Sequence, residues 1–228
     1  MTTPANLRPA RPRDDLPSVA RLLTLSDNVV AIALTLLLFQ LKVPATALVH
    51  DPGSAADLAA QLAKQASHLV SYVIAFYIIA LFWLVHRRVF RHVAGHRDSL
   101  AWWNFAFLAT ITVMPFTSNL LGEYPGNPLA VDIFAVNLLL AVLATRVMFE
   151  VGRRVGLMAG DIDAREIRVL RARAAATVIV VAVSVGLAWV NPDAAKYCWV
   201  LIPIAVWTAE HRSARPASPS GPPDAAGQ

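Results

Sequence analysis

The sequence predicts an all-α integral membrane protein with six transmembrane helices. Of its 228 residues, 57% are hydrophobic and only 15% are charged, whereas a soluble domain usually carries about 25% charged residues. Six apolar runs approach the roughly 20 residues that a helix needs to cross a bilayer. Basic residues gather in every second interval between these runs, which is the pattern of a single consistent topology.

The six predicted spans follow one another with short polar connections. Their expected bounds are 22–41, 68–85, 100–121, 129–149, 174–190 and 194–209. Residues 57–67 have helical periodicity and are expected to extend the second span outward. A charged segment, 150–173, is expected to connect the fourth span to the fifth. The last two spans are the shortest, and Pro203 lies inside the sixth.

Flanking composition and charge predict the domain organisation and the orientation. Residues 1–20 and 211–228 are rich in proline and small polar residues, so we expect two disordered cytoplasmic tails around one membrane domain at 21–210. Arginines cluster before the first span, between the second and third, between the fourth and fifth, and after the sixth. In the alternate connections, the only lysines and arginines are Lys42, Lys64 and Lys196. Positive loops remain in the cytoplasm, so we expect a multi-pass protein of the cell membrane with both termini cytoplasmic.

Several function classes find no support in the sequence. The net charge of +5 is explained by loop orientation, and no nucleic-acid recognition motif accompanies it. The metalloprotease motif HExxH and the hydrolase motif GxSxG are both missing from the sequence, so we expect no enzyme activity. The single cysteine, Cys198, has no partner for a disulfide or a metal site, and no cofactor is expected.

Polar residues open the first span. Arg21, Ser26 and Asp27 lie near one end of an otherwise apolar helix. Ionisable groups at such depth are costly unless they are paired or hydrated, and they mark function by default. The alternative is that Arg21 and Asp27 only cap the helix at the membrane interface, where Asp27 suits the helix dipole.

Three further polar residues are expected at the same depth. Trp83 and His86 are three residues apart at the end of the second span and therefore share a helix face. Asn104 lies near the start of the third span. If the helices pack, the nitrogens of Trp83 and His86 could reach Asp27 or Ser26, so these residues predict a polar network between helices. The alternative is an interfacial tryptophan beside a solvated histidine.

A stripe of residues follows Asp27 along the first span. Asn28, Ile32, Thr35 or Leu36, and Phe39 recur at the spacing of one helix face. The alternative is a stripe that faces lipid or packs against another helix. Such a stripe would have the same residues, because the whole helix is apolar.

These residues carry a resemblance to a known family. The segment from Arg21 to Asp27, in which three residues separate the arginine from Leu25-Ser26-Asp27, resembles a known signature. It is the Arg-x-x-x-Phe-Ser-Asp signature of the transmembrane protein 175 potassium channel family. Leu25 stands where phenylalanine is usual, and Asn28 replaces a commonly small residue. The segments 28–44, 83–86 and 104–116 are also similar to prokaryotic members. The resemblance covers spans one to three in detail, and the later spans only in hydropathy and loop length.

The resemblance implies both a fold and a function. It implies a homotetramer of six-span subunits that conducts potassium ions passively, with the first helices around a central pore. The chain lacks the Thr-Val-Gly-Tyr-Gly filter of ordinary potassium channels. Carried over residue by residue, Ile32 falls at the main constriction, followed by Leu36 and Phe39, with the Thr35 hydroxyl beside the ring. Arg21, Ser26, Asp27, Trp83 and His86 would form the polar network that holds the first two helices.

Two other functions stay open. A proton-conducting pathway is one, because His86 and Asp27 could serve it. An ion-coupled secondary transporter is the other, although its support is limited to one proline-bearing span in each half, at Pro115 and Pro203. An Asp27 that faces the pore would attract cations, whereas an Asp27 paired with Arg21 or His86 would be structural. The resemblance favours the structural role.

Overall fold

The computed structural model describes residues 16–46, 50–51, 53–95, 97–158 and 164–214. This part is helical and contains no strand, which confirms the predicted all-α class. Most of both predicted tails lies outside the described residues, although α1 already begins at Leu16 and α8 continues to Ala214. The helices are α1 (Leu16–Leu36), the 3₁₀ segment η1 (Leu37–Gln40), α2 (Ala55–Ala63), α3 (Ala66–Phe90), α4 (Asp98–Glu123), α5 (Pro128–Arg154), α6 (Ala164–Ala188), α7 (Pro192–Cys198), η3 (Trp199–Leu201) and α8 (Ile202–Ala214).

Within the described residues, five helical segments are long and apolar enough to cross a membrane. They are Val19–Gln40, Ala66–Phe90, Asp98–Glu123, Pro128–Arg154 and Ala164–Ala188. They contain the first four predicted spans almost whole and most of the fifth. The chain therefore has the helices of a multi-pass membrane protein, while a sixth crossing stays a prediction.

The sixth predicted span is broken into three pieces. The helix changes to the 3₁₀ form over η3 and resumes as α8. Pro203 is the physical cause, because it has no N–H to donate to the carbonyl oxygen of Trp199 four residues earlier. The N–H of Ile202 bonds that oxygen instead, which is the shorter 3₁₀ connection.

Two other boundaries differ from the predicted ones. Of residues 57–67, only Ala66 and Ser67 extend the second span, because α2 is a separate helix that ends at Ala63 and α3 begins at Ala66. The charged segment 150–173 is largely helical: α5 continues to Arg154 and α6 begins at Ala164. Gly156 ends α5 with a positive φ of 69°. The Leu157 N–H then bonds the Gly152 carbonyl at 3.0 Å, as in a Schellman motif.

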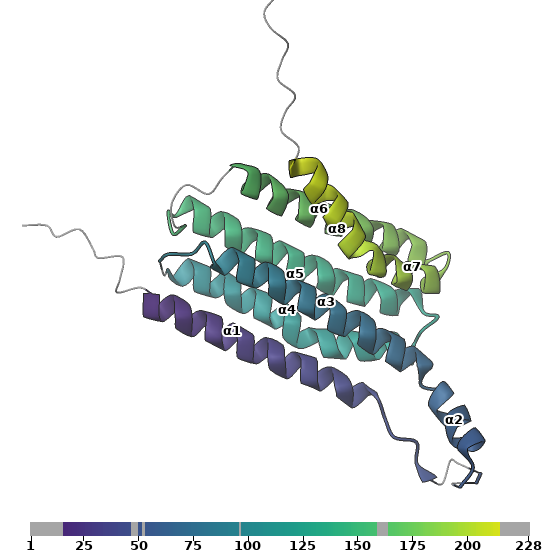
Figure 1. Cartoon of the computed structure of the whole chain (residues 1–228). Coiled ribbons are helices and arrows are strands. Elements are labelled where there is room, and N and C mark those ends of the chain that lie inside the picture. Colours follow the sequence, from purple (N-terminus) through teal and green to yellow (C-terminus); the bar gives the residue numbers. More distant parts are fainter. Residues whose placement is uncertain (1–15, 47–49, 52, 96, 159–163, 215–228) are drawn as a thin grey trace, which may run out of the picture.

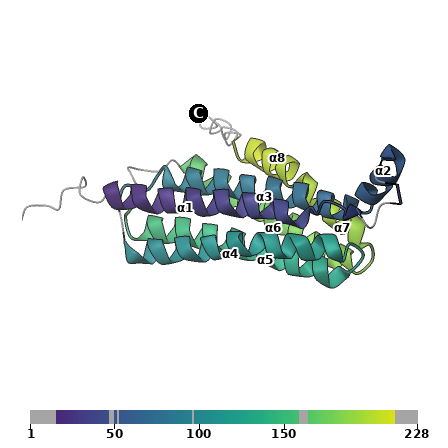
Figure 2. The same ribbon diagram turned by 90° about the horizontal axis from the view of Figure 1, so that it is seen from below.

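The long helices pack side by side in a bundle, and α1 lies at one edge (Figures 1 and 2). Helix α1 packs against α4 and α3, α4 packs against α5, and α6 packs against α5 and α8. The start of α1 and the α3–α4 and α5–α6 connections lie at one end of the bundle (Figure 1). Helix α2 and the α4–α5 turn lie at the other end (Figure 1). The start of the first span and the arginine-rich intervals between spans two and three and between spans four and five therefore share one end.

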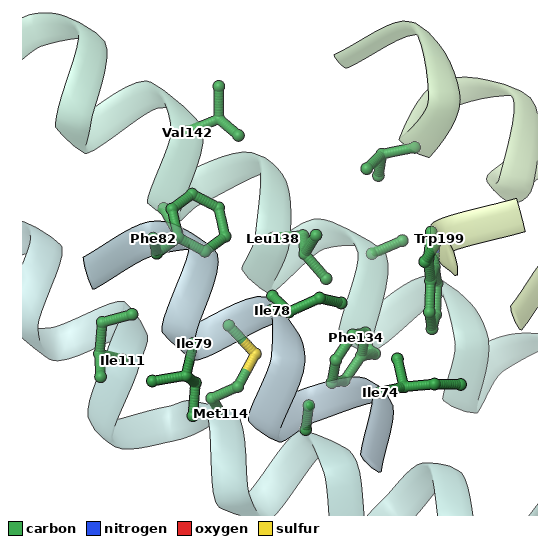
Figure 3. Close-up of a cluster of buried hydrophobic side chains, with 14 of the residues drawn as sticks. Ile74, Ile78, Ile79, Phe82, Ile111, Met114, Phe134, Leu138, Val142 and Trp199 are labelled. Carbon is green, nitrogen blue, oxygen red and sulfur yellow. The ribbon is translucent and has the colours of Figure 1, made fainter. Parts of the chain in front are cut away.

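An apolar core joins α3, α4, α5 and the broken last segment. Ile78, Met114, Phe134 and Leu138 meet between the helices in Figure 3 and are almost completely buried. The indole of Trp199 stacks on Phe134 with ring centroids 4.8 Å apart, and its Nε1 donates to Ser184 Oγ at 2.8 Å. The last segment is therefore fixed to the bundle by apolar packing and by a satisfied polar group.

Ion pairs connect helices at the arginine-rich end. Arg88 on α3 donates to both carboxylate oxygens of Glu166 on α6, at 2.8 and 3.0 Å. Glu150 accepts from Arg153 and Arg154 one turn later on α5. The backbone N–H of Ala94 donates to the Leu157 carbonyl at 2.7 Å and ties the two connections together. The bidentate pair between Arg88 and Glu166 gives a defined geometry, which explains why α6 begins well before its apolar part.

Candidate functional site

Helix α1 presents two different faces. A buried stripe of Ser26, Val30 and Ala33, continued by Leu37 and Gln40 of η1, packs against α3 and α4. These positions repeat at intervals of three and four residues, which is one face of a helix. Both polar and apolar side chains therefore attach α1, at the edge of the bundle, to α3 and α4.

The opposite face of α1 is bare and mostly apolar. Ile32 is 58% exposed, Leu36 44% and Phe39 77%. Asn28 and Thr35 are also exposed. These are the residues that the family resemblance assigns to a pore, and the other described residues of the chain leave all of them exposed. The Thr35 hydroxyl donates to the backbone oxygen of Ile32 at 2.8 Å, so it is already satisfied within the helix.

A buried polar cluster, formed by Ser26, His86 and Asn104, locks the other face. All three side chains are completely buried. Asn104 Nδ2 donates to Ser26 Oγ at 3.0 Å, and His86 Nε2 lies 2.7 Å from Asn104 Oδ1. An amide oxygen only accepts, so His86 carries its proton on Nε2 in this contact. One asparagine from α4 therefore connects α1 to α3.

Aromatic rings surround the histidine of this cluster. The His86 ring stacks on Phe107 of α4 with centroids 4.8 Å apart and lies 4.5 Å from the ring of Phe90. Water is excluded from such a site, so each hydrogen bond matters more, and an unpaired polar group would be costly. The cluster fixes the rotation of α1 about its own axis, because only one face of α1 supplies Ser26.

A second contact joins Asp27 to α3. Trp83 Nε1 donates to Asp27 Oδ1 at 2.8 Å, and the Arg87 guanidinium lies over the Trp83 ring at 4.9 Å from its centroid. Asp27 is half-buried. The carboxylate therefore accepts from the indole of Trp83, and neither Arg21 nor His86 bonds it.

Arg21 is not brought into this arrangement. Its side chain is exposed at the start of α1, and no described residue forms a hydrogen bond or ion pair with it. The structure thus unites Ser26, Asp27, Trp83, His86 and Asn104 and leaves Arg21 outside. A residue at the end of a span that reaches the interface needs no buried partner.

The sequence interpretation missed a second polar cluster, at the far end of α1. The hydroxyls of Ser71 on α3 and Ser118 on α4 each lie 3.2 Å from Gln40 Oε1, and Ser118 Oγ lies 3.1 Å from the Ser71 carbonyl oxygen. All three residues are buried. The available signal was the stripe itself, because Gln40 is the only amide in the last turn of the span and falls in register with Ser26.

Gly122 allows the close approach at this second cluster. A Cβ atom there would lie 2.6 Å from His68 Nδ1 and 2.8 Å from Ser71 Oγ. We expect Gly122→Ala to destabilise the folded protein by about 1 kcal/mol, because overpacking outweighs the helix propensity of alanine. Thermal unfolding in detergent measures this. Gly186→Ala in α6 is the matched control, since nothing lies within 4 Å of its Cβ position; equal effects of the two changes would contradict the packing argument.

Arg146 is another residue that the sequence interpretation passed over. It is a half-buried charge within α5, and an arginine inside a predicted span was the signal. No group of three or more His, Cys, Asp or Glu side chains among the described residues is arranged to hold a metal ion.

Comparison with known proteins identifies the family. The family model described as the endosomal/lysosomal potassium channel TMEM175 matches residues 21–115, a segment that holds the whole first polar cluster and Gln40 and Ser71 of the second. A potassium channel of Chamaesiphon minutus is 31% identical over 151 residues, covering 64% of this chain and 72% of that protein. A potassium channel of Streptomyces collinus is 30% identical over 171 residues, covering 73% and 80%.

More distant relatives share parts of the chain. The human endosomal/lysosomal proton channel TMEM175 is 29% identical over 140 residues, which are 60% of this chain and 27% of the human protein. The crystal structure of a lysosomal potassium-selective channel TMEM175 homolog from Chamaesiphon minutus has the same fold, with a TM-score of 0.68 at 22% identity over 85% of this chain and 98% of that one. With its signature residues gathered around α1, this chain belongs to the TMEM175 potassium channel family, a family of ion channels and not of enzymes.

Proposed function

We propose that the chain is one subunit of a homotetrameric, potassium-selective channel whose pore is lined by the exposed face of α1. The observation that carries the proposal is the division of α1 into a hydrogen-bonded inner face and a bare outer face. A helix with such firm anchors on one side can present its other side at a defined angle to symmetry mates. The exposed residues Ile32, Thr35, Leu36 and Phe39 would then face the axis.

The chemistry of this face supports a gate and not a binding filter. A ring of Ile32 side chains forms an apolar constriction, and such constrictions block ions by losing their water. Leu36 and Phe39 would add further rings on successive turns of the segment. No strong ion site is needed for conduction, so we expect a modest preference for potassium over sodium. Both bacterial relatives are named potassium channels.

We propose that the protein lies in the cell membrane with both termini in the cytoplasm. Arg87 and Arg88 lie in the last turn of α3, Arg91 follows that helix, and Arg153 lies in the last turn of α5. These residues belong to one end of the bundle, whereas Lys42, Lys64 and Lys196 belong to the other. Basic loops remain on the cytoplasmic side. The start of α1 shares the basic end (Figure 1).

Proton conduction is the second candidate, and a specific observation favours it. The human relative is named a proton channel. His86 is completely buried, and its Nδ1 has no hydrogen-bond partner among the described residues. A buried imidazole with one open nitrogen is a group that could relay protons. An ion-coupled transporter has less support, because only one of the two proline-bearing spans is broken: the segment with Pro203 is divided, but α4 continues through Pro115.

Flux in liposomes tests the proposal. Purified protein should release potassium down its gradient alone, with no sodium or proton gradient required. Native mass measurement in mild detergent should give four chains per particle. Flux that depends on a second ion would instead support a transporter, and a pH change without potassium movement would support the proton pathway.

We expect Asp27→Ala to weaken assembly more than permeation. The change leaves Trp83 Nε1 without its acceptor, which lies 2.8 Å away, and it frees the start of α1 from α3. The fraction of tetramer after purification measures the loss, and Asp27→Asn, which keeps an acceptor oxygen, should restore most of it. Normal tetramers with altered conductance would place Asp27 on the pore side.

A further inference from the structure

Asn28 is a polar side chain within an apolar membrane segment. It lies nine residues from one end of Val19–Gln40 and twelve from the other, which is about 14 Å and about 18 Å at 1.5 Å per residue. The hydrocarbon core of a bilayer is about 30 Å thick, so Asn28 belongs to the membrane interior and not to the head-group region. Its side chain is exposed, and no described residue forms a hydrogen bond with it.

The other polar side chains nearby on this face already have partners. The hydroxyls of Thr24 and Thr35 donate to backbone oxygens of their own helix, at 3.0 and 2.8 Å. Between these two threonines, every other exposed side chain of α1 is apolar. Asn28 thus presents an amide oxygen and two amide hydrogens that bond no other described residue. An unpaired amide in hydrocarbon costs several kcal/mol, so Asn28 must face water or another subunit and not lipid.

The position of Asn28 relative to Ile32 is defined by the helix. The two residues are four apart, so they share one face of α1 and are separated by about 6 Å along its axis. In the proposed tetramer, on which this inference rests, that face lines the pore. Four Asn28 side chains would then form a ring of amides directly beside the apolar constriction, on the side of the arginine-rich end. Leu36 and Phe39, on the other side of the constriction, offer no polar group.

We infer that the amide oxygens of four Asn28 side chains form a weak site for a monovalent cation such as potassium, at the cytoplasmic entrance of the Ile32 constriction. Amide oxygens can replace part of the hydration shell of potassium, as backbone carbonyl oxygens do in channel filters. The amide hydrogens of each side chain remain available to water, so the oxygen can point toward the axis. A bound ion would be partly dehydrated one helical turn before the narrowest ring.

The charges around this level favour a cation over an anion. Asp27, the preceding residue, accepts from the indole of Trp83 at 2.8 Å, and a neutral donor does not cancel the formal charge of a carboxylate. Arg87 lies over the Trp83 ring, 4.9 Å from its centroid, and forms no ion pair with Asp27. Arg21 is seven residues away, about 10 Å along α1. This distance exceeds the Debye length of about 8 Å at physiological ionic strength.

Potassium currents in inside-out membrane patches that contain the full chain test the site, because the bath then contacts the proposed cytoplasmic side. Asn28→Ala removes the amide without adding bulk, and it should raise the half-saturating potassium concentration about tenfold, as loss of hydrogen-bond-like contacts to a charge does. Asn28→Asp should lower that concentration about fivefold, because it adds negative charge to the ring. Asn119→Ala is the matched control, since Asn119 is an exposed asparagine on α4 without a described partner. Unchanged half-saturation in Asn28→Ala, or an equal rise in the control, would overturn the inference.

Two further measurements separate the cation site from the proposed channel. A wild-type protein that forms no tetramer or carries no potassium current would contradict the proposed function itself. If the wild type conducts as a tetramer and Ile32→Asn raises its flux, while the Asn28 variants keep the wild-type half-saturation, only the cation site is wrong. Native mass measurement of Asn28→Ala should still give four chains. Dissociation of that variant would mean that the amides bond neighbouring subunits and not an ion, and the inference would be wrong.

Discussion

Replacing Ile32 by asparagine is expected to raise potassium flux into liposomes by about tenfold and to lower the preference for potassium over sodium. Four amide groups at the narrowest ring would hold water where four isoleucines exclude it. A tenfold rise corresponds to about 1.4 kcal/mol less barrier. The flux of potassium and sodium under matched gradients measures both effects.

Ile179→Asn is the control for this experiment. Ile179 lies on α6 and is 62% exposed, close to the 58% of Ile32. The same chemical change there places amides on a surface away from α1, so the flux should stay at the wild-type level. Unchanged flux in Ile32→Asn, or an equal rise in Ile179→Asn, would remove Ile32 from the pore.

Asn104→Leu is expected to lower the free energy of unfolding by up to about 3 kcal/mol and to reduce the yield of tetramer. Leucine is similar in size but leaves His86 Nε2 without the acceptor 2.7 Å away. Ser26 keeps its bond to the Leu22 carbonyl, so the main cost is the buried imidazole N–H. Thermal unfolding in detergent measures the change.

A double substitution separates the hydrogen bond from the packing. His86→Phe combined with Asn104→Leu removes donor and acceptor together, and the His86 site is already lined by Phe90 and Phe107. Replacing both partners by apolar groups of similar shape is nearly neutral. The double variant should therefore be more stable than Asn104→Leu alone. If the two effects simply add, the polar contact contributes no coupling.

The sequence predicted the helical class and the polar residues on three helices because these leave strong local signals. A long apolar run can adopt few backbone structures in a bilayer. Polar residues are conspicuous in such runs, here Ser26, Asp27, Trp83, His86 and Asn104. The partners were harder to assign. Asp27 pairs with Trp83, and only the packed structure determines which of several polar groups at one depth meet.

Other features depend on contacts that a single sequence does not reveal. Residues 164–173 were interpreted as connection because they are charged, yet Glu166 binds Arg88 across helices and the segment folds as the start of α6. The Gln40 cluster was missed because one amide and two serines are unremarkable separately. Pro203 was noted inside the sixth predicted span, but neither the break before it nor the 3₁₀ turn that results was predicted.

The two polar clusters on α1 have a mechanical consequence. Ser26 and Gln40 are anchored to α3 and α4 near opposite ends of the segment, about 21 Å apart at 1.5 Å per residue. Between Asp27, which accepts from Trp83, and Gln40, the buried residues of the inner face are the apolar Val30, Ala33 and Leu37, and dispersion contacts have no preferred direction. Sliding or turning the helix would break hydrogen bonds, whereas bowing its middle would break none. Ile32 lies close to the midpoint, so the part of the helix that is easiest to displace sideways is also the part that would set the diameter of the ring.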